Sequence, residues 1–525
     1  MDGSSIISQI KRALPDFAAL GVTRDHPDEV CLEVTREAFR SVCLVLHRAL
    51  LSPVMTLFAL DERPEKGVFT LKAVFLDAKG SRWVIVSTGI AQEAPSFDSL
   101  AKGIHSASLF EREIREMFGI EPTGHPDPRR LHLHDEVWPQ DNPPLRRDFQ
   151  GTRPGSLLEY RFNRVEGEGI CEVPVGPVHA GIIGPGHFRF SVAGEPIINL
   201  EIRLGFTHRG VEKLFEGRTC SEAVRLAERV CGDSSFAHSL AFARAAEKIS
   251  GAEVPDQASY RRAIFLELER MYNHVHDIGG IAVDVGFSFP AAYASVMKET
   301  LLRLNERLTG SRYLKHVNAP GGVAAALDAA GRGALLGTLK GLRRDLKELA
   351  GMLNGSISFM DRVDTTGILR RKTAEDLGVV GLAGRASGIR MDLREHFPGV
   401  YAQAGFRMAA QESGDVLARL RVRIEEFEES CRLIQEFARR LSWGEPLRAE
   451  APPRQGSALG YAEGCRGPVL YWLKTDPQGR IARCKITDPS FRNWQGLSYA
   501  VLGDIIPDFP LCNKSFDLSY AGNDL

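Results

Sequence analysis

The sequence predicts an α+β protein: a small α+β domain at the N-terminus, an extended linker, and a large domain with a helical-bundle core and peripheral β-hairpins. Three observations predict this fold. Residues 67–90 are rich in branched and aromatic side chains that favour strands. Residues 122–154 are dense in proline, aspartate and arginine, which disfavours regular structure. Through most of residues 220–441, apolar side chains recur at the three- and four-residue spacing of helices.

The composition is that of a globular protein without a strong charge. Of the 525 residues, 43% are hydrophobic, and 66 basic residues oppose 67 acidic ones. A formal charge of -1 gives no electrostatic reason to expect nucleic acid or an anionic membrane as a partner. We find no apolar run of about 18 residues and no signal-peptide pattern. We therefore expect a protein on the cytoplasmic side, held at a membrane only through other subunits.

Nine cysteines are scattered along the chain, and none forms a Cys-x-x-Cys pair. An odd number of scattered cysteines fits a reducing compartment. It also leaves the chain without a recognisable ligand set for an iron-sulfur cluster or a structural zinc. We expect no cofactor bound by this chain alone.

The N-terminal domain is expected over residues 1–125. A helix is predicted at 37–50, and strands at GVFTLKAVFL (67–76) and RWVIVSTGI (82–90). Residues 126–160 are expected to be the extended linker.

The large domain is expected over residues 161–525. It opens with a β-rich segment at 173–203 and ends with strands at VLYWLKTD (469–476) and GRIARCKITDP (479–489), followed by a loop-rich tail. Between them the apolar spacing predicts helices. These cover residues 220–250, 260–279, 293–308, 329–353 and 413–441.

Three ordered motifs lie at the end of the first domain and in the linker. They are EREIREMFG (111–119), GHPDPRRL (124–131) and LRRDF (145–149). They resemble the signature of the C-type component of complex I, a small α+β component of respiratory NADH dehydrogenases, with Glu116 where that family usually has aspartate. Taken singly, each motif also fits a solvated charged helix followed by a turn.

The large domain resembles the D-type component of complex I and the homologous large subunits of nickel-iron hydrogenases. The markers follow the family order over nearly all of residues 160–500. They are GPVH (176–179), GHFR (186–189), HRGVEK (208–213), ELERMYNH (267–274), TGSR (309–312), PGGV (320–323), RASG (385–388) and GD (414–415). The fused C-then-D order resembles the group 4 hydrogenases of the formate-hydrogenlyase and energy-converting-hydrogenase-related type. The resemblance implies a fold like that of the nickel-iron hydrogenase large subunit.

The resemblance also locates the positions where the family holds nickel and iron. That site needs four thiolates from two Cys-x-x-Cys pairs. The first pair falls on Cys231 and Ser234, and the second on Ser490 and Asn493. A hydroxyl that stays protonated and a neutral amide are poor substitutes for thiolates. We therefore expect no nickel-iron centre.

The family's quinone site is also altered in this chain. Its tyrosine position falls on Leu226 and its histidine position on Ile183, with His179 matching a neighbouring family histidine. Leucine can pack against a quinone headgroup but can give it neither a hydrogen bond nor a proton. Whether a quinone binds is left open.

Polar residues are expected to converge in the former metal cavity. Buried charge needs a partner, so we expect Arg229 to pair with Asp233 or Asp488. One interpretation is a proton-loading or substrate site, and the alternative is an inert, internally satisfied polar core. The full predicted set is His179, Arg229, Cys231, Asp233, Ser234, His238, Asp488, Ser490 and Asn493.

Two single residues have alternative interpretations. His274 matches a family histidine close to the [4Fe-4S] cluster of the adjacent small subunit, where a cationic donor would stabilise the reduced cluster. Alternatively, it is a histidine packed at a subunit interface. Cys231 is either a reactive thiol beside Arg229 or an inert buried cysteine.

The resemblance implies a large subunit on the cytoplasmic face of the inner membrane, acting only within an assembled oxidoreductase complex. Expected partners are an iron-sulfur small subunit like the B-type component of complex I, a membrane subunit of the H type, and antiporter-like membrane subunits. The expected role couples electron transfer from the partner cluster to proton or quinone events and ion translocation, without hydrogenase activity. The alternatives are a quinone reductase with a remodelled site that uses His179 and Asp233, and a redox-inert scaffold.

Overall fold

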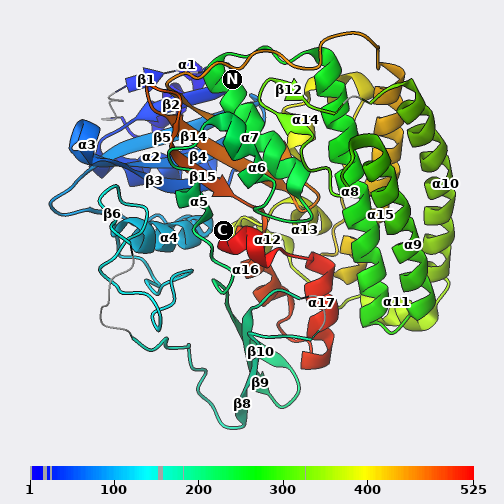
Figure 1. The fold of residues 1–525 in the computed structure, drawn as a ribbon. Coiled ribbons are helices and arrows are strands. Elements are labelled where there is room, and N and C mark those ends of the chain that lie inside the picture. The colour runs from blue at the N-terminus through cyan, green and yellow to red at the C-terminus, as the bar shows by residue number, and fades with distance from the viewer. Residues whose placement is uncertain (1–2, 16–20, 24–25, 152–157, 181–182, 326) are drawn as a thin grey trace.

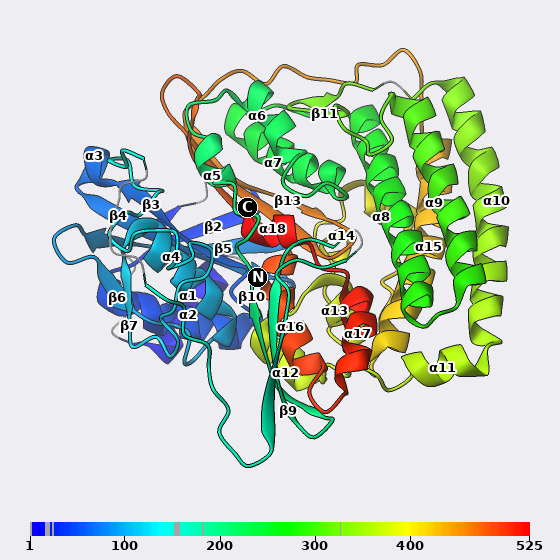
Figure 2. The ribbon, with the colours of Figure 1, turned by 60° about the horizontal axis from the view of Figure 1, so that its bottom comes forward.

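The computed structural model describes residues 3–15, 21–23, 26–151, 158–180, 183–325 and 327–525, and it shows a mixed α+β protein (Figure 1). A five-stranded sheet lies at one end and a bundle of long helices at the other. A three-stranded sheet lies between them in both views (Figures 1 and 2). The predicted fold class is confirmed.

The N-terminal sheet has the strand order β1-β2-β5-β4-β3. Neighbouring strands are antiparallel except β2 and β5, which are parallel. The two predicted strands are confirmed as β4 and β5. The five strands are β1 (Gly21–Thr23), β2 (Glu29–Glu33), β3 (Thr56–Glu62), β4 (Val68–Asp77) and β5 (Arg82–Ala91).

Helices cover one face of this sheet, and the large domain covers the other. Apolar side chains of α1 (Gly3–Ala13), α2 (Arg36–Leu50) and α4 (Ser108–Phe118) share one core with the sheet. The predicted helix at 37–50 is confirmed as α2. On the opposite face, Phe58 packs on Trp472 of the three-stranded sheet, with ring centroids 5.0 Å apart. The two parts of the chain are therefore joined by a shared apolar core.

The motif-bearing helix α4 anchors the linker. Glu111, Glu113 and Glu116 are all buried, so the alternative of a solvated charged helix is wrong. The Glu116 carboxylate accepts hydrogen bonds from the backbone N–H groups of Leu131 at 2.9 Å and His132 at 3.0 Å. Between β7 (Glu121–Thr123) and β8 (Ile170–Val175), the described residues form no helix or strand.

A three-stranded antiparallel sheet follows the linker and extends from the body of the molecule (Figure 2). Its strands are β8, β9 (His187–Ala193) and β10 (Ile197–Arg203), which confirms the predicted β-rich segment.

Four long helices lie side by side in the bundle (Figures 1 and 2). They confirm the predicted helices, with bounds that extend a few residues beyond most of them. Six leucines of the third helix, spaced by three or four residues from Leu335 to Leu353, are all buried against the bundle. The four are α8 (Asp256–Asp284), α9 (Ser288–Thr309), α10 (Ala329–Asn354) and α15 (Val416–Arg439).

The helix predicted at 220–250 is two helices, α6 (Cys220–Ala227) and α7 (Ser235–Ser250). Helix α6 begins at a capping box between Thr219 and Glu222. Helix α7 begins where the N–H groups of Phe236 and Ala237 donate to the Glu269 carboxylate of α8, at 2.6 and 2.9 Å. A buried carboxylate from another helix thus fixes the start of α7. It leaves residues 228–234 as a loop.

The C-terminal part begins with an antiparallel sheet and continues as helices. The predicted strands are confirmed as β14 (Pro468–Thr475) and β15 (Ile481–Thr487), joined by β13 (Gly456–Glu463). The predicted loop-rich tail is wrong. It forms α16 (Ser490–Ala500), α17 (Phe509–Phe516) and α18 (Tyr520–Asp524), because apolar residues such as Trp494, Leu497 and Phe516 pack together with the β8–β10 sheet.

Shorter helices connect these parts. They are α3 (Arg63–Lys66), α5 (Val211–Leu214), α11 (Ile357–Val363), α12 (Arg371–Leu377), α13 (Gly381–Ala386) and α14 (Leu393–His396). No helix within the described ranges is both long enough and apolar enough to span a membrane.

Candidate functional site

The loop between α6 and α7 meets the start of α16, and most of the predicted cavity residues come together there. The thiol of Cys231 is buried, with Sγ 2.9 Å from Asp233 Oδ1 and 3.1 Å from Ser519 Oγ. Ser234 Oγ also donates to Asp233 Oδ1, at 3.2 Å. Burial and the negative charges of Asp233 and Asp488 raise the pKa of the Cys231 thiol well above its usual value. The thiol therefore stays protonated at neutral pH.

His238 and Asp488 form the second part of the site. His238 Nε2 lies 3.1 Å from Asp488 Oδ2, and its Nδ1 lies 2.9 Å from the hydroxyl of Tyr471. All three side chains are buried. Burial alone would raise the pKa of Asp488, but hydrogen bonding to His238 and to the Ser490 backbone lowers it. The ring of His238 is held at both nitrogens.

The residues at the second former cysteine pair are used for structure. Ser490 Oγ accepts a hydrogen bond from the Ser519 backbone at 3.0 Å. The Asn493 side chain bonds both the N–H and the carbonyl of Val380, at 3.0 and 3.1 Å, and is buried. These groups hold neighbouring segments together and present no anionic sulfur. A thiolate-bridged nickel-iron centre does not fit these side chains.

A single ion is a different case. Ligand atoms of Cys231, His238 and Asp488 lie within 4.8 Å of one another. One thiol, one imidazole and one carboxylate are ligand types that one divalent ion such as zinc accepts, but they cannot bridge two metals in the way that four thiolates do.

The predicted partner of Asp233 was wrong. Arg229 is exposed, and its guanidinium donates to the Arg225 carbonyl at 2.6 Å. Arg466, at the β13–β14 turn, takes the predicted place. Its guanidinium lies 2.8 Å from Asp233 and 2.6 Å from Asp517. Burial alone would raise the pKa of Asp233, but Arg466 lowers it to about 2.

The charges continue from Arg466 into the bundle. Asp517 also pairs with Lys514 at 2.7 Å. Burial and the nearby charge of Asp517 raise the pKa of Asp277 on α8 to about 7, although Arg423 of α15 donates to this carboxylate at 2.9 Å. Asp277 Oδ1 is buried without a hydrogen-bond partner among the described residues. A protonatable carboxyl thus lies at the inner end of a chain of charges that begins beside Cys231.

The structure does not bring His179 into hydrogen-bonding contact with this site. Its Nε2 lies 2.7 Å from the Gly186 carbonyl, in the loop between β8 and β9, and its ring packs on Phe188. Ile183 in the same loop is 52% exposed, and Leu226 packs against the bundle core. The predicted convergence is therefore confirmed for Cys231, Asp233, Ser234, His238, Asp488 and Ser490. It is corrected for His179, for Arg229, and for Asn493, which bonds the Val380 backbone instead.

His274 is buried inside the chain, so its side chain is not available to a subunit interface. Its Nε2 is 2.7 Å from Glu426, and burial lowers its pKa to about 4. Both the interface interpretation and the cationic-donor role are therefore corrected. The ring belongs to a buried network of ion pairs. That network comprises Glu267, Arg270, Arg385, Asp392, Arg394, Glu426 and Glu463.

Alkylation tests the state of Cys231. At pH 8, iodoacetamide is expected to label Cys231 at least about 100-fold more slowly than Cys171, because the buried thiol is protonated while Cys171 is exposed. Mass spectrometry of the folded protein gives both rates, and unfolding in denaturant should make them similar. Equal rates in the folded protein would show that Cys231 is a reactive thiolate.

Sequence reasoning missed Arg466, Asp517, Tyr471, Glu269 and Asp277. A partial signal existed for Arg466, which lies between two glycines in Gly464–Gly467, a pattern typical of a tight turn that presents a side chain. The other four are separated by long stretches of chain from the residues they contact, so no local pattern marks them.

Comparison with known proteins gives a consistent result. The family described as respiratory-chain NADH dehydrogenase, 30 Kd subunit, matches residues 32–154. The respiratory-chain NADH dehydrogenase 49 Kd subunit family matches residues 284–453 and 446–524. Nickel-dependent hydrogenase matches residues 209–278.

Individual relatives span most of the chain. Formate hydrogenlyase subunit 5 of Escherichia coli (strain K12) is 34% identical over 89% of this chain and 84% of its own length. Hydrogenase-4 component G of the same organism is 32% identical over 89% and 83%. The C/D component of NADH-quinone oxidoreductase from Bacteroides thetaiotaomicron is 29% identical over 75% and 79%.

One solved structure is similar over most of the chain. It is a chain from the membrane-bound sulfane sulfur reductase, an archaeal respiratory membrane complex. The match has a TM-score of 0.64 and 26% identity, and it covers 68% of this chain and 99% of the other.

Proposed function

Because this chain belongs to the family of fused complex I C/D-like, group 4 hydrogenase-related large subunits, we propose that it is the peripheral large subunit of a membrane-bound respiratory complex without hydrogenase activity. Its proposed partners are an iron-sulfur small subunit, an H-type membrane subunit and antiporter-like subunits, on the cytoplasmic face of the membrane. The [4Fe-4S] cluster of the small subunit would supply electrons, and this chain would respond to its charge by moving protons.

The observation that carries this proposal is the chain of charged groups from Cys231 to Asp277. Asp233, Arg466 and Asp517 are linked by ion pairs of 2.6 to 2.9 Å, and Asp277 has a pKa near 7. A carboxyl with this pKa exchanges its proton near neutral pH in response to a small change of nearby charge. The former metal cavity thus keeps a group suited to proton uptake, although it lacks the ligands for nickel and iron.

Asp277→Asn tests the proton-coupling role. In the wild-type complex, the reduction potential of the partner cluster is expected to fall with rising pH around pH 7, by at most about 59 mV per pH unit. The reason is that Asp277 is neutral below its pKa of about 7 and ionised above it. In the variant the group is neutral at every pH, so the slope between pH 6 and 8 should be lost or reduced. Potentiometric titration followed by electron paramagnetic resonance measures it.

Asp361→Asn is the control, because Asp361 is exposed on α11. It should leave the slope unchanged. An unchanged slope in Asp277→Asn, together with unchanged ion translocation by the assembled complex, would favour the redox-inert scaffold instead.

The quinone-reductase alternative is tested separately. In the form that uses His179 and Asp233, it requires both residues at one site, and the structure places His179 in the β8–β9 loop on a backbone carbonyl. Stopped-flow reoxidation of the reduced cluster by a quinone analogue, with His179→Ala as the variant, addresses it. A quinone-dependent step that is lost in His179→Ala would support this alternative against our proposal.

A further inference from the structure

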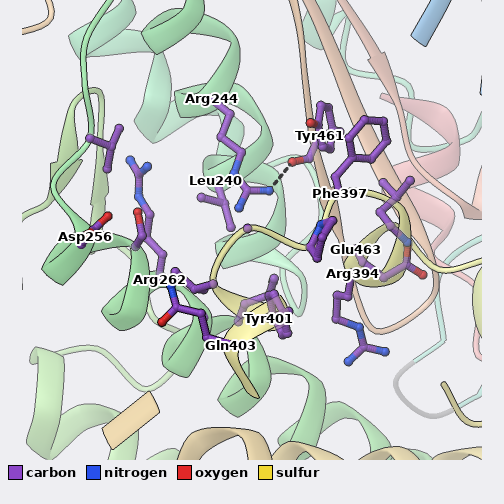
Figure 3. A pocket seen from close by; sticks show the side chains of 18 of the residues that line it. Leu240, Arg244, Asp256, Arg262, Arg394, Phe397, Tyr401, Gln403, Tyr461 and Glu463 are labelled. Carbon is purple, nitrogen blue, oxygen red and sulfur yellow. Dashed lines mark hydrogen bonds between the residues drawn. The ribbon is translucent and has the colours of Figure 1, made fainter. Parts of the chain in front are cut away.

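The largest cavity in the described part of the protein lies away from the former metal positions. It has a volume of about 330 Å³ and is enclosed by α7, the first half of α8, β13, and the segment that contains α14 and the 3-10 helix η2 (Gly399–Ala404) (Figure 3). None of the six residues that converge around Cys231 lines it. Ligand cavities in proteins begin at about 300 Å³, so this one suits a small molecule.

One cation in the wall of this cavity lacks a counter-charge. Arg244 donates a hydrogen bond of 2.8 Å to the Tyr461 carbonyl, which Figure 3 shows as a dashed line, and it forms no ion pair with a described residue. One turn further along α7, Lys248 pairs with both Asp28 and Glu29, at 2.6 and 2.9 Å. Arg244 is thus the unmatched cation on this face of the helix.

The other charged groups around the cavity leave this mismatch uncorrected. Arg262 is matched by a bidentate pair with Glu247, whose nearer contact is 2.5 Å. The guanidinium of Arg394 points away from Arg244 in Figure 3 and binds Asp392 at 2.7 Å. Asp256 lies at the first turn of α8 and forms no ion pair with Arg244, so an incoming anion must avoid it. A largely desolvated guanidinium without an anion is unfavourable, which makes this position receptive to one.

Aromatic rings form the neighbouring wall. Phe397 and Tyr461 lie with centroids 4.5 Å apart, and Phe397 is stacked on Trp83 of the N-terminal sheet at 5.3 Å. Leu240, Leu266 and Val400 add apolar surface. The cavity therefore combines one free cation with a rigid aromatic surface.

We propose that this cavity binds a small molecule that has one carboxylate or phosphate group attached to an aromatic or other flat apolar part. The anionic group pairs with Arg244, and the apolar part packs against Phe397 and Tyr461. The site is separate from the proton-coupling residues, and its existence does not depend on the proposed function.

Calorimetric titration of the assembled complex tests this assignment. The probes are benzoate and phenyl phosphate, which distinguish a carboxylate from a phosphate preference, and benzyl alcohol as the neutral control. We expect saturable 1:1 binding of at least one anion and much weaker binding of the alcohol. Arg244→Gln should weaken the anion at least tenfold, and Arg244→Lys should retain part of the affinity because it keeps the charge. Arg421→Gln, at an exposed site on α15, should change nothing.

A second variant keeps the test decisive if Arg244→Gln does not assemble. Phe397→Ala should weaken phenyl phosphate binding severalfold while leaving weak binding of inorganic phosphate unchanged. The proposal is overturned if neither anion shows saturable binding up to about 10 mM. It is also overturned if Arg244→Gln, or Phe397→Ala in its place, binds phenyl phosphate as tightly as the wild type.

Discussion

Replacing Arg466 by methionine is expected to lower the free energy of unfolding by about 3 kcal/mol. Arg466 is 8% exposed and pairs with Asp233 and Asp517. Its removal leaves two carboxylates facing each other without a cation, and such uncompensated charge costs about 3 to 5 kcal/mol when fully buried. The lower figure applies because the side chain of Asp233 is 39% exposed and partly solvated. Urea unfolding of the purified protein measures the change.

Arg492 provides a matched control from the same region. It is 1% exposed, contacts the Val54 carbonyl and the Met55 sulfur, and has no carboxylate partner among the described residues. Burial lowers its pKa to about 9. Because Arg492→Met leaves no carboxylate unpaired, it should cost clearly less than Arg466→Met. Equal losses would show that the Arg466 ion pairs contribute no more than packing does.

Local pattern was enough to predict most of the fold. Leu335 to Leu353 repeat at helical spacing and form α10, and the branched residues of β4 and β5 form strands. The break before α7 was not predictable, because it depends on Glu269, which lies 35 residues beyond Ser234 and accepts the first N–H groups of the helix. The helical tail was missed because its apolar residues acquire their packing partners only in the folded protein, beneath the β8–β10 sheet.

The candidate site was predictable where the family motifs reach it. The two former cysteine-pair segments were located from sequence, and the structure joins them through Cys231, Ser519 and Ser490. The electrostatic partners were not predictable. Arg229 is near Asp233 in sequence but faces solvent, whereas Arg466 is 233 residues away and forms the ion pair. Ion pairing depends on which side chains the fold brings together, and sequence proximity was a poor guide to it.

The second large expected effect is the complete absence of hydrogenase chemistry. Of the four positions that hold thiolates in nickel-iron enzymes, only Cys231 has a thiol, and its sulfur is hydrogen-bonded to Asp233 and Ser519. Asn493 is bound to the Val380 backbone, and Ser490 to the Ser519 backbone. We therefore expect no hydrogen oxidation with viologen dyes and no proton reduction, under conditions in which the partner clusters are reduced.

Metal content tests the central claim most directly. Inductively coupled plasma mass spectrometry of the purified complex, from cells grown with added nickel, should give iron for the partner clusters and nickel far below one atom per chain. One zinc per chain, bound by Cys231, His238 and Asp488, would leave the claim intact, because these residues can hold a single ion. One nickel per chain would contradict it.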